Sequence, residues 1–339
     1  MGTRFSRQEL FKPIGCDGQI RLAESTVGII GCGALGSVIA ETLVRAGIGA
    51  IHLVDRDFVE MSNIHRQQLF VEKDALNLTA KVIAAEQRLK EIRSNVHLFT
   101  YLENADGTLI EDIAEKCDIL VDATDNFETR MAINDAAHKY GIPWVYGACV
   151  SASGTVFTFI PGKTACFRCL FPALPSLNET CDSVGVIAPA VQITAAHQCT
   201  EVMQWLTGHP EKLRGKVYHF DVWNHTSLEV GVSRIKKEDC PTCGHCPVYP
   251  SLEKSEEMKS MVLCGRDTIQ IIPQANRRVS LEDAERLAIR QGYRFKKTPY
   301  FIQFHTEQYR MILFTNGRLL IHGLQDSTEG LKLFHQMFV

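Results

Sequence analysis

Hydrophobic positions in the first 150 residues form short continuous runs, separated by longer segments in which apolar residues recur every three or four positions. The first run covers residues 25–31, and a periodic segment from about residue 34 to Ala46 follows it and ends at Gly47. Short apolar runs are typical of strands buried on both faces, whereas the periodic spacing is typical of amphipathic helices. The same alternation predicts further strands at residues 50–55, 96–101, 118–124 and 143–148, with helices at about 78–92 and 129–140.

The pattern changes after Gly154, where strand signals follow one another without helices between them. Strands are predicted at 155–160 and 217–222, with a loop and an apolar helix between Pro172 and Gly208. Alternation of strands and helices predicts a Rossmann-like α/β fold with a mostly parallel sheet, and the later strands predict that this sheet becomes mixed.

The pattern in the last quarter of the chain predicts a separate small domain. Residues 249–260 are polar and charged, as expected of a linker. Beyond them lie strand signals, a helix opened by Ser280 and ended by Gly292, an Asn316-Gly317 hairpin turn and a final helix. We therefore expect a large α/β domain over residues 1–248, a linker over 249–260, and a small α+β domain over 261–339.

Composition and charge exclude some classes of partner. The chain has 339 residues, 45% of them hydrophobic, and a formal net charge of -3 with no long basic run. These values argue against a nucleic acid or an anionic membrane as the main partner. Since no stretch approaches 18 apolar residues and the N-terminus lacks an apolar signal segment, we expect a cytoplasmic protein.

The turn after the first strand has the spacing of a phosphate-binding loop. Gly31, Gly33 and Gly36 allow the backbone to turn tightly and approach a phosphate at a helix N-terminus, where free N–H groups favour negative charge. Asp55 ends the second strand, where a carboxylate can accept ribose hydroxyls. This pattern by itself fits NAD as well as ATP.

The residues after Asp55 favour a triphosphate. The segment 55–67 is rich in charged and amide side chains, and it includes Arg66, whose guanidinium can donate two hydrogen bonds to phosphate oxygens. Lys81 adds a positive charge on the next helix. Asp122 and Asp125 end another parallel strand, the edge where ligands bind in open α/β sheets, and such carboxylates suit a Mg²⁺ ion.

Cysteine spacing predicts a structural metal site. Two Cys-x-x-Cys pairs, Cys166 with Cys169 and Cys240 with Cys243, together supply the four thiolates that Zn²⁺ binds tetrahedrally. Four protein ligands leave no open position, so the zinc is expected to be structural. Cys246 forms a second, overlapping pair with Cys243, so the spacing alone leaves the fourth ligand open.

Several ordered motifs in residues 5–250 together resemble the MoeB/ThiF adenylyltransferase family, which is related to the ubiquitin-activating enzymes. The motifs are "SRQ" at 6–8, "GCGALG", "DRDFVEMSNIHRQ", Lys81, "DATDNFETR" and the two cysteine pairs. The resemblance implies that ATP and Mg²⁺ adenylate the C-terminal glycine of a ubiquitin-like sulfur carrier ending in Gly-Gly, with release of pyrophosphate. It places the nucleotide loop at Gly31, Gly33 and Gly36, the ribose side at Asp55 and Asp57, the phosphate side at Asn63, Arg66, Gln67 and Lys81, the metal at Asp122, and the rest of the nucleotide site at Asp125 and Asn126.

The resemblance carries three further expectations. It implies a homodimer in which Arg7 reaches the nucleotide of the neighbouring subunit. It assigns the zinc to Cys166, Cys169, Cys240 and Cys243, which leaves Cys246 free. It also marks Cys181, in the loop after the first cysteine pair, as a candidate thiol for sulfur transfer from a cysteine desulfurase or rhodanese-type donor.

Several alternatives remain open at the level of sequence. Residues 261–339 do not resemble a rhodanese domain, and the carrier could be MoaD, for molybdopterin, or ThiS, for the thiamin thiazole. An NAD-dependent dehydrogenase would need a hydride-acceptor site, for which no His or Arg constellation is present. A tRNA-modifying relative that activates a carboxylate and a zinc scaffold without enzymatic activity are the other two alternatives.

Overall fold

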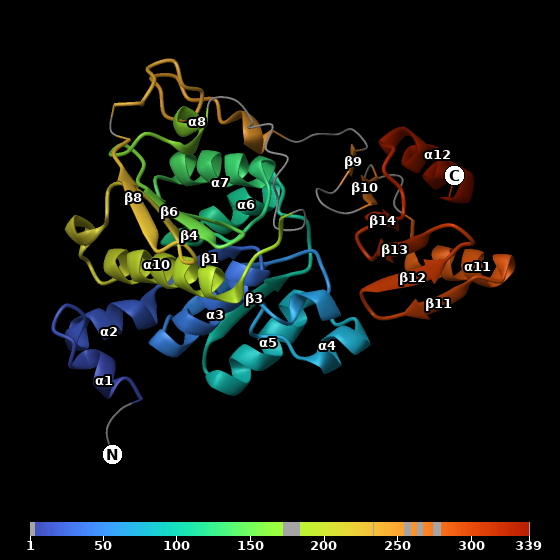
Figure 1. Ribbon diagram of the computed structural model, residues 1–339, viewed down its shortest axis with the longest axis horizontal. Coiled ribbons are helices and arrows are strands. Elements are labelled where there is room, and N and C mark those ends of the chain that lie inside the picture. Colours follow the sequence, from blue (N-terminus) through green and yellow to red (C-terminus); the bar gives the residue numbers. More distant parts are fainter. Residues whose placement is uncertain are drawn as a thin grey trace. The chain divides into compact units, whose positions relative to one another are not determined.

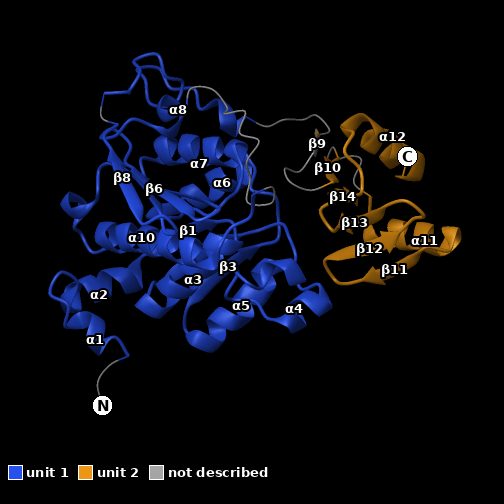
Figure 2. Cartoon of the chain, viewed as in Figure 1, with its two compact units in different colours: residues 1–254 blue, residues 255–339 orange. Residues whose placement is uncertain are grey.

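The computed structural model describes residues 4–171, 184–232, 234–253, 259–262, 267–273 and 279–338. The chain divides into two compact units, residues 1–254 and 255–339 (Figure 2). Within the described ranges, no helix is both long enough and apolar enough to cross a membrane.

The first unit is built on one eight-stranded sheet with the order β3-β2-β1-β4-β5-β6-β7-β8 (Figure 1). Strands β3, β2, β1, β4 and β5 are parallel to one another, and β6, β7 and β8 continue the sheet in antiparallel pairs. This is the predicted α/β sheet that becomes mixed, and the order 3-2-1-4-5 is that of a nucleotide-binding sheet. The strands are β1 Thr26–Ile30, β2 Ala50–Val54, β3 His97–Tyr101, β4 Ile119–Asp122, β5 Trp144–Val150, β6 Ser153–Phe159, β7 Val217–Asp221 and β8 Thr226–Val230.

Helices cover both faces of this sheet. Helices α3 (Ala34–Ala46), α5 (Lys81–Ile92) and α10 (Ala188–Leu206) bury their apolar residues in one core, and α6 (Gly107–Ala114) and α7 (Phe127–Tyr140) bury theirs in the other (Figure 1). The shorter elements are α1 Ser6–Glu9, α2 Gly15–Glu24, α4 Glu72–Asn77, α8 Phe167–Leu170, η1 Met61–Asn63, η2 Pro210–Lys212 and η3 Pro250–Leu252.

The helix predicted from about Leu78 to Ile92 begins three residues later than expected. Helix α4 ends at Asn77, Leu78 after it has a left-handed φ of 54°, and α5 begins only at Lys81. Between them the chain extends, because Ala80 forms a β-bridge with Phe58 and the Val59 N–H donates to the Thr79 carbonyl at 2.8 Å. The tertiary pairing therefore overrides the local helical pattern, and it fixes Lys81 at the start of α5.

The second unit is an antiparallel sheet with two helices, as the sequence predicts. Its strand order is β11-β12-β13-β14-β10-β9, and its helices are α11 Leu281–Gln291 and α12 Ser327–Phe338. Both helices contribute to a single core with one face of the sheet. The Asn316-Gly317 turn joins β13 to β14, with Gly317 at φ 84°. The strands are β9 Lys259–Val262, β10 Thr268–Ile272, β11 Arg294–Lys297, β12 Phe301–His305, β13 Arg310–Phe314 and β14 Leu319–His322.

Candidate functional site

The glycine loop connects the end of β1 to the start of α3. Close packing surrounds two of its glycines, and open space lies beside the third. Gly31 has φ 103°, and a Cβ there would lie 2.5 Å from the Ala123 carbonyl oxygen. A Cβ on Gly36 would lie 2.0 Å from the Gly31 carbonyl oxygen. Packing therefore requires glycine at both positions. At Gly33, the N-cap of α3, the nearest such atom is Gln67 Nε2 at 3.8 Å, so open space lies beside the first N–H groups of the helix.

Gln67 and Asp55 lie beside this open space. Gln67 is 4% exposed, and its Oε1 has no hydrogen-bond partner among the described residues. Asp55 Oδ2 accepts the Cys32 N–H at 2.8 Å and Oδ1 accepts the Asp57 N–H at 2.8 Å, which ties the glycine loop to the end of β2. Burial raises the pKa of Asp55, while Lys81 and these N–H groups act in the opposite direction. The Gln67 Nε2 group beside Gly33 and the first N–H groups of α3 are hydrogen-bond donors, as a phosphate-bearing ligand requires.

The other three residues expected on the phosphate side each interact with a neighbouring residue. Lys81 is 6% exposed, and its Nζ lies 3.6 Å from Asp57 Oδ2. Asn63 is buried, and its Oδ1 accepts the Glu60 N–H at 3.1 Å in the turn η1. Arg66 is half-buried and donates from one terminal nitrogen to the Ser62 carbonyl at 2.9 Å. Nearby structure thus orients these three of the four cationic or amide groups expected on the phosphate side.

The carboxylate of Asp122 is already engaged. Asp122 is fully buried at the end of β4, and its Oδ2 accepts a hydrogen bond from Arg130 Nε at 2.9 Å, within an ion pair. Its Oδ1 accepts from both the backbone N–H and the hydroxyl of Thr124, at 2.9 and 2.7 Å. Burial alone would lower the pKa of Arg130, but the neighbouring Asp122 charge raises it above its usual value.

Asp125 is exposed, whereas Asp122 is not. The Asp125 carboxylate lies close enough to Arg130 to contribute to the raised pKa of that guanidinium. Asn126, next to it, is the N-cap of α7, and its Oδ1 accepts the Thr129 N–H at 2.8 Å. The geometry therefore divides the predicted acidic pair into a structural member, Asp122, and a member at the solvent-facing edge, Asp125.

Two residues of this edge were not predicted from the sequence. Arg130 occurs in the quoted motif "DATDNFETR", yet only the fold shows that it faces Asp122. Gln198, fully buried on α10, donates from Nε2 to the carbonyls of Asp122 at 2.7 Å and Val145 at 3.3 Å. A Cβ on Gly147 would lie 2.3 Å from the Gln198 side chain, so this glycine makes room for it. The amide joins the end of β4 to β5 next to their last paired residues, Val121 and Val145.

Arg7 lies at the other end of α3 from the glycine loop. It is exposed on α1, and the neighbouring Gln8 donates from Nε2 to the carbonyl of Ala46 at 2.8 Å. Ala46 ends α3, whereas Gly33 precedes its first residue. A helix of 13 residues spans about 20 Å. Arg7 therefore lies far from the glycine loop of its own chain.

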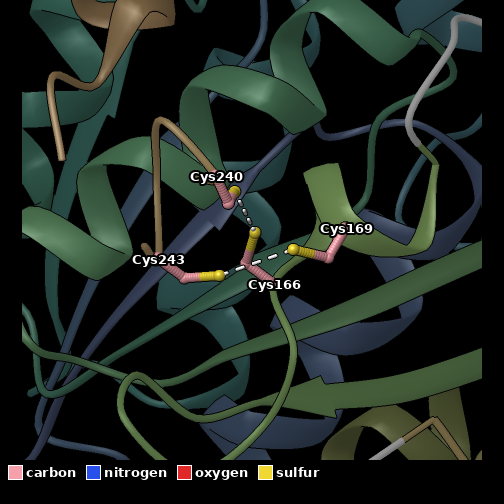
Figure 3. A group of neighbouring side chains, drawn as sticks. All are labelled: Cys166, Cys169, Cys240 and Cys243. Carbon is pink, nitrogen blue, oxygen red and sulfur yellow. Dashed lines mark hydrogen bonds between the residues drawn. The ribbon is translucent and has the colours of Figure 1, made fainter. Parts of the chain in front are cut away.

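The two cysteine pairs converge as predicted. Cys166, Cys169, Cys240 and Cys243 place their sulfurs within 4.8 Å of one another (Figure 3). Sγ of Cys166 lies 3.5 Å from Sγ of Cys240, and Sγ of Cys169 lies 3.5 Å from Sγ of Cys243. Tetrahedral Zn–S bonds of about 2.3 Å would place the sulfurs about 3.8 Å apart, so the cluster fits zinc after a small expansion.

The other two candidate thiols stand apart from this cluster. Cys246 is exposed and does not belong to the group of four. Cys181 lies outside the described residues. The described chain returns at Val184, and the Ser151 N–H donates to the Gly185 carbonyl at 2.8 Å, which joins the segment before α10 to the residue after β5.

The parallel sheet, the open glycine loop and the polar edge around it define a nucleotide-binding α/β protein. The chain belongs to the ThiF family, whose model matches residues 5–242. It is 42% identical over 336 residues to the sulfur carrier protein ThiS adenylyltransferase of Bacillus subtilis (strain 168), which is 99% of each chain. It is 33% identical to the adenylyltransferase and sulfurtransferase MOCS3 of Aedes aegypti over 84% of this chain and 65% of that protein.

A solved structure shares the fold. The crystal structure of E. coli MccB with ATP matches with a TM-score of 0.62 and 22% sequence identity, covering 72% of this chain and 74% of that one. The named relatives are adenylyltransferases, which excludes the dehydrogenase and scaffold alternatives left open by the sequence.

Proposed function

We propose that this enzyme uses ATP to adenylate the C-terminal glycine of a ubiquitin-like sulfur carrier of the ThiS type, with release of pyrophosphate. The observation that carries the proposal is the match to the Bacillus subtilis ThiS adenylyltransferase over 99% of both chains. That match includes the second compact unit, so the whole two-unit chain corresponds to one carrier-activating enzyme. The alternative to be tested against a ThiS-type carrier is a carrier of the MoaD type.

The chemistry follows from the weakness of a carboxylate as an electrophile. Attack of the glycine carboxylate on the α-phosphate forms an acyl adenylate, and the bond from the α-phosphorus to the pyrophosphate oxygen breaks. This step requires positioning of the two reactants and neutralisation of the phosphate charge, and it requires no side-chain nucleophile. In this proposal, the free N–H groups at Gly33, the amide of Gln67 and the charges of Arg66 and Lys81 supply those functions.

The family resemblance implied Asp122 as the magnesium ligand. We assign this role to Asp125 instead. Both oxygens of Asp122 already accept hydrogen bonds, and Arg130 neutralises its charge. Bound Mg²⁺ would neutralise phosphate charge beside the exposed carboxylate of Asp125. Asp125→Asn should raise the Mg²⁺ concentration needed for half-maximal activity without changing the melting temperature. Asp122→Asn should instead lower the melting temperature, because it leaves Arg130 buried without a counter-charge.

We further propose that Cys166, Cys169, Cys240 and Cys243 hold a structural zinc. The closed set of four thiolates provides no open coordination position, so no reaction step is assigned to the metal. The ion would join the segment after β6 to the segment after β8. Reduced, freshly purified protein should contain about one zinc per chain, and a metal analysis that finds none would remove this assignment.

The active unit in this proposal is a homodimer in which Arg7 of one subunit completes the nucleotide site of the other. The position of Gln8 against the far end of α3 supports it, because Arg7 cannot reach the glycine loop of its own chain from there. Adenylation is assigned to residues 1–248, and docking of the carrier or of a sulfur donor to residues 261–339. Cys181 is proposed as the thiol that consumes the adenylate during sulfur transfer.

Pyrophosphate exchange into ATP in the presence of each purified carrier tests the function. Exchange that depends on a ThiS-type carrier ending in Gly-Gly, together with a mass increase of one adenylate on that carrier, is the expected result. Exchange with a MoaD-type carrier alone would change the carrier assignment. Absence of exchange with both carriers would overturn the proposed activity.

A further inference from the structure

A fully buried carboxylate on α7 contacts both cysteine segments. Asp135 has no exposed surface, and its Oδ2 accepts hydrogen bonds from Arg168 at 3.0 Å and from the Ser251 N–H at 2.9 Å. Its Oδ1 accepts from the hydroxyl of Thr242 and from the Asn134 amide. These four bonds occupy the four lone-pair positions of a carboxylate, so Asp135 cannot also bind a metal or a substrate.

The contacted residues lie between the metal ligands. Arg168 stands between Cys166 and Cys169, and Thr242 stands between Cys240 and Cys243. Arg168 also donates from Nε to the Thr242 hydroxyl at 3.1 Å, so the interiors of the two pairs contact each other as well as Asp135.

Asn134, adjacent to Asp135, strengthens the same attachment. Its Oδ1 accepts the N–H of Phe167, which follows Cys166, at 2.8 Å. Three of the four residues inside the two Cys-x-x-Cys pairs are therefore held by two consecutive side chains of α7. The fourth, Pro241, accepts from the N–H groups of Val248 and Tyr249 through its carbonyl.

We propose that Asp135 is a positioning residue for the metal centre: it brings the two cysteine pairs together so that the four sulfurs converge before the ion binds. The paired ligands are 74 residues apart in the sequence, so their encounter has a large entropic cost unless another contact holds them. A charged, fully desolvated anchor on a helix of the main core provides that contact independently of the metal. This inference rests on the zinc assignment above.

The rate at which a chromophoric chelator withdraws zinc from the reduced enzyme measures this role directly. Loss of an outer partner of a metal site weakens metal binding by about 10–100-fold. Asp135→Asn, which keeps the shape of the side chain and removes its charge, should therefore release zinc about 10–100 times faster. Thr242→Val should release it faster by a smaller factor, and Thr242→Ser, which retains the hydroxyl, should restore the parent rate.

A matched control separates positioning from general loosening of the fold. Thr158 is also a buried threonine whose hydroxyl donates to a buried carboxylate, that of Glu201 at 2.8 Å, but it lies on β6 away from the cysteines. Thr158→Val should leave the release rate unchanged. The double variant of Asp135→Asn and Thr242→Val should release zinc no faster than Asp135→Asn alone, since Thr242 acts through Asp135.

The outcomes distinguish this inference from the zinc assignment. Parent protein without zinc would overturn the metal site itself. Zinc-containing Asp135→Asn and Thr242→Val proteins that release the ion at the parent rate would overturn the role of Asp135, as would equal acceleration in Thr158→Val. If Asp135→Asn does not fold, the comparison of Thr242→Val with Thr242→Ser decides the matter, because equal rates in those two variants would refute the proposal.

Discussion

Replacement of Gly33 by alanine should abolish ATP binding while leaving the fold intact. The added Cβ would meet its nearest neighbour, Gln67 Nε2, at 3.8 Å, which is an ordinary van der Waals distance. The methyl group would instead occupy the open space beside the first N–H groups of α3, where the proposed phosphate approaches the backbone. Protein stability should therefore change little, and the loss should appear only in the presence of nucleotide.

The expected size of the effect follows from binding linkage. ATP at 100 times its dissociation constant stabilises the parent by about 2.7 kcal/mol. For a unit of this size such a gain raises the melting temperature by about 5–10 °C. Thermal unfolding with and without ATP and Mg²⁺ should show this rise in the parent and no rise in Gly33→Ala, whose pyrophosphate exchange should also be lost.

Gly36→Ala is the matched comparison within the same loop. Its Cβ would lie 2.0 Å from the Gly31 carbonyl oxygen, and backbone cannot move aside as a flexible side chain can. Overpacking of this kind lowers stability by about 1–3 kcal/mol or more. Gly36→Ala should therefore melt at a lower temperature even without ATP. A Gly33→Ala protein that keeps both the ATP-induced shift and the exchange activity would refute the assignment of this space to the phosphates.

Three further predictions concern other parts of the molecule. Mixing Arg7→Ala and Arg66→Ala subunits should restore part of the exchange activity, because one site of the heterodimer then has both native residues; no recovery after verified subunit exchange would place Arg7 outside the partner's site. Burial lowers the pKa of His138 to about 4, although the Asp135 charge acts in the opposite direction. The neutral imidazole therefore stabilises the folded state fully above pH 6.5, and this stabilisation is lost as the pH falls toward 4. The unfolding free energy of the parent should then fall more steeply over that interval than that of His138→Gln, by up to about 1.4 kcal/mol per pH unit, and parallel profiles in urea titrations would contradict this. Cys181→Ser should keep pyrophosphate exchange near the parent level and lower thiocarboxylate formation with the physiological sulfur donor; loss of exchange would place Cys181 in the nucleotide site.

Local patterns were sufficient for the features that depend on neighbouring residues in the chain. Alternation of apolar runs and periodic segments predicted a mostly parallel sheet with helices on both faces, because burial on both faces of a parallel strand is visible in the strand itself. The spacing of Gly31, Gly33 and Gly36 predicted the strand-to-helix turn, because a tight turn depends on the conformational freedom of those residues themselves. The two Cys-x-x-Cys pairs predicted a four-sulfur cluster because each pair already has metal-binding spacing.

Only the tertiary structure decided how distant segments share their charges and hydrogen bonds. Asp122 and Asp125 are equivalent in the motif, and the distinction between them arises because α7 turns Arg130 back onto the end of β4. Gln198 reaches the same strand end from 76 residues away in the sequence. Asp135 contacts residues 33 and 107 positions further along the chain. Such partners are chosen by packing in a medium where unpaired polar groups are unfavourable, and a sequence pattern records only that each group is polar.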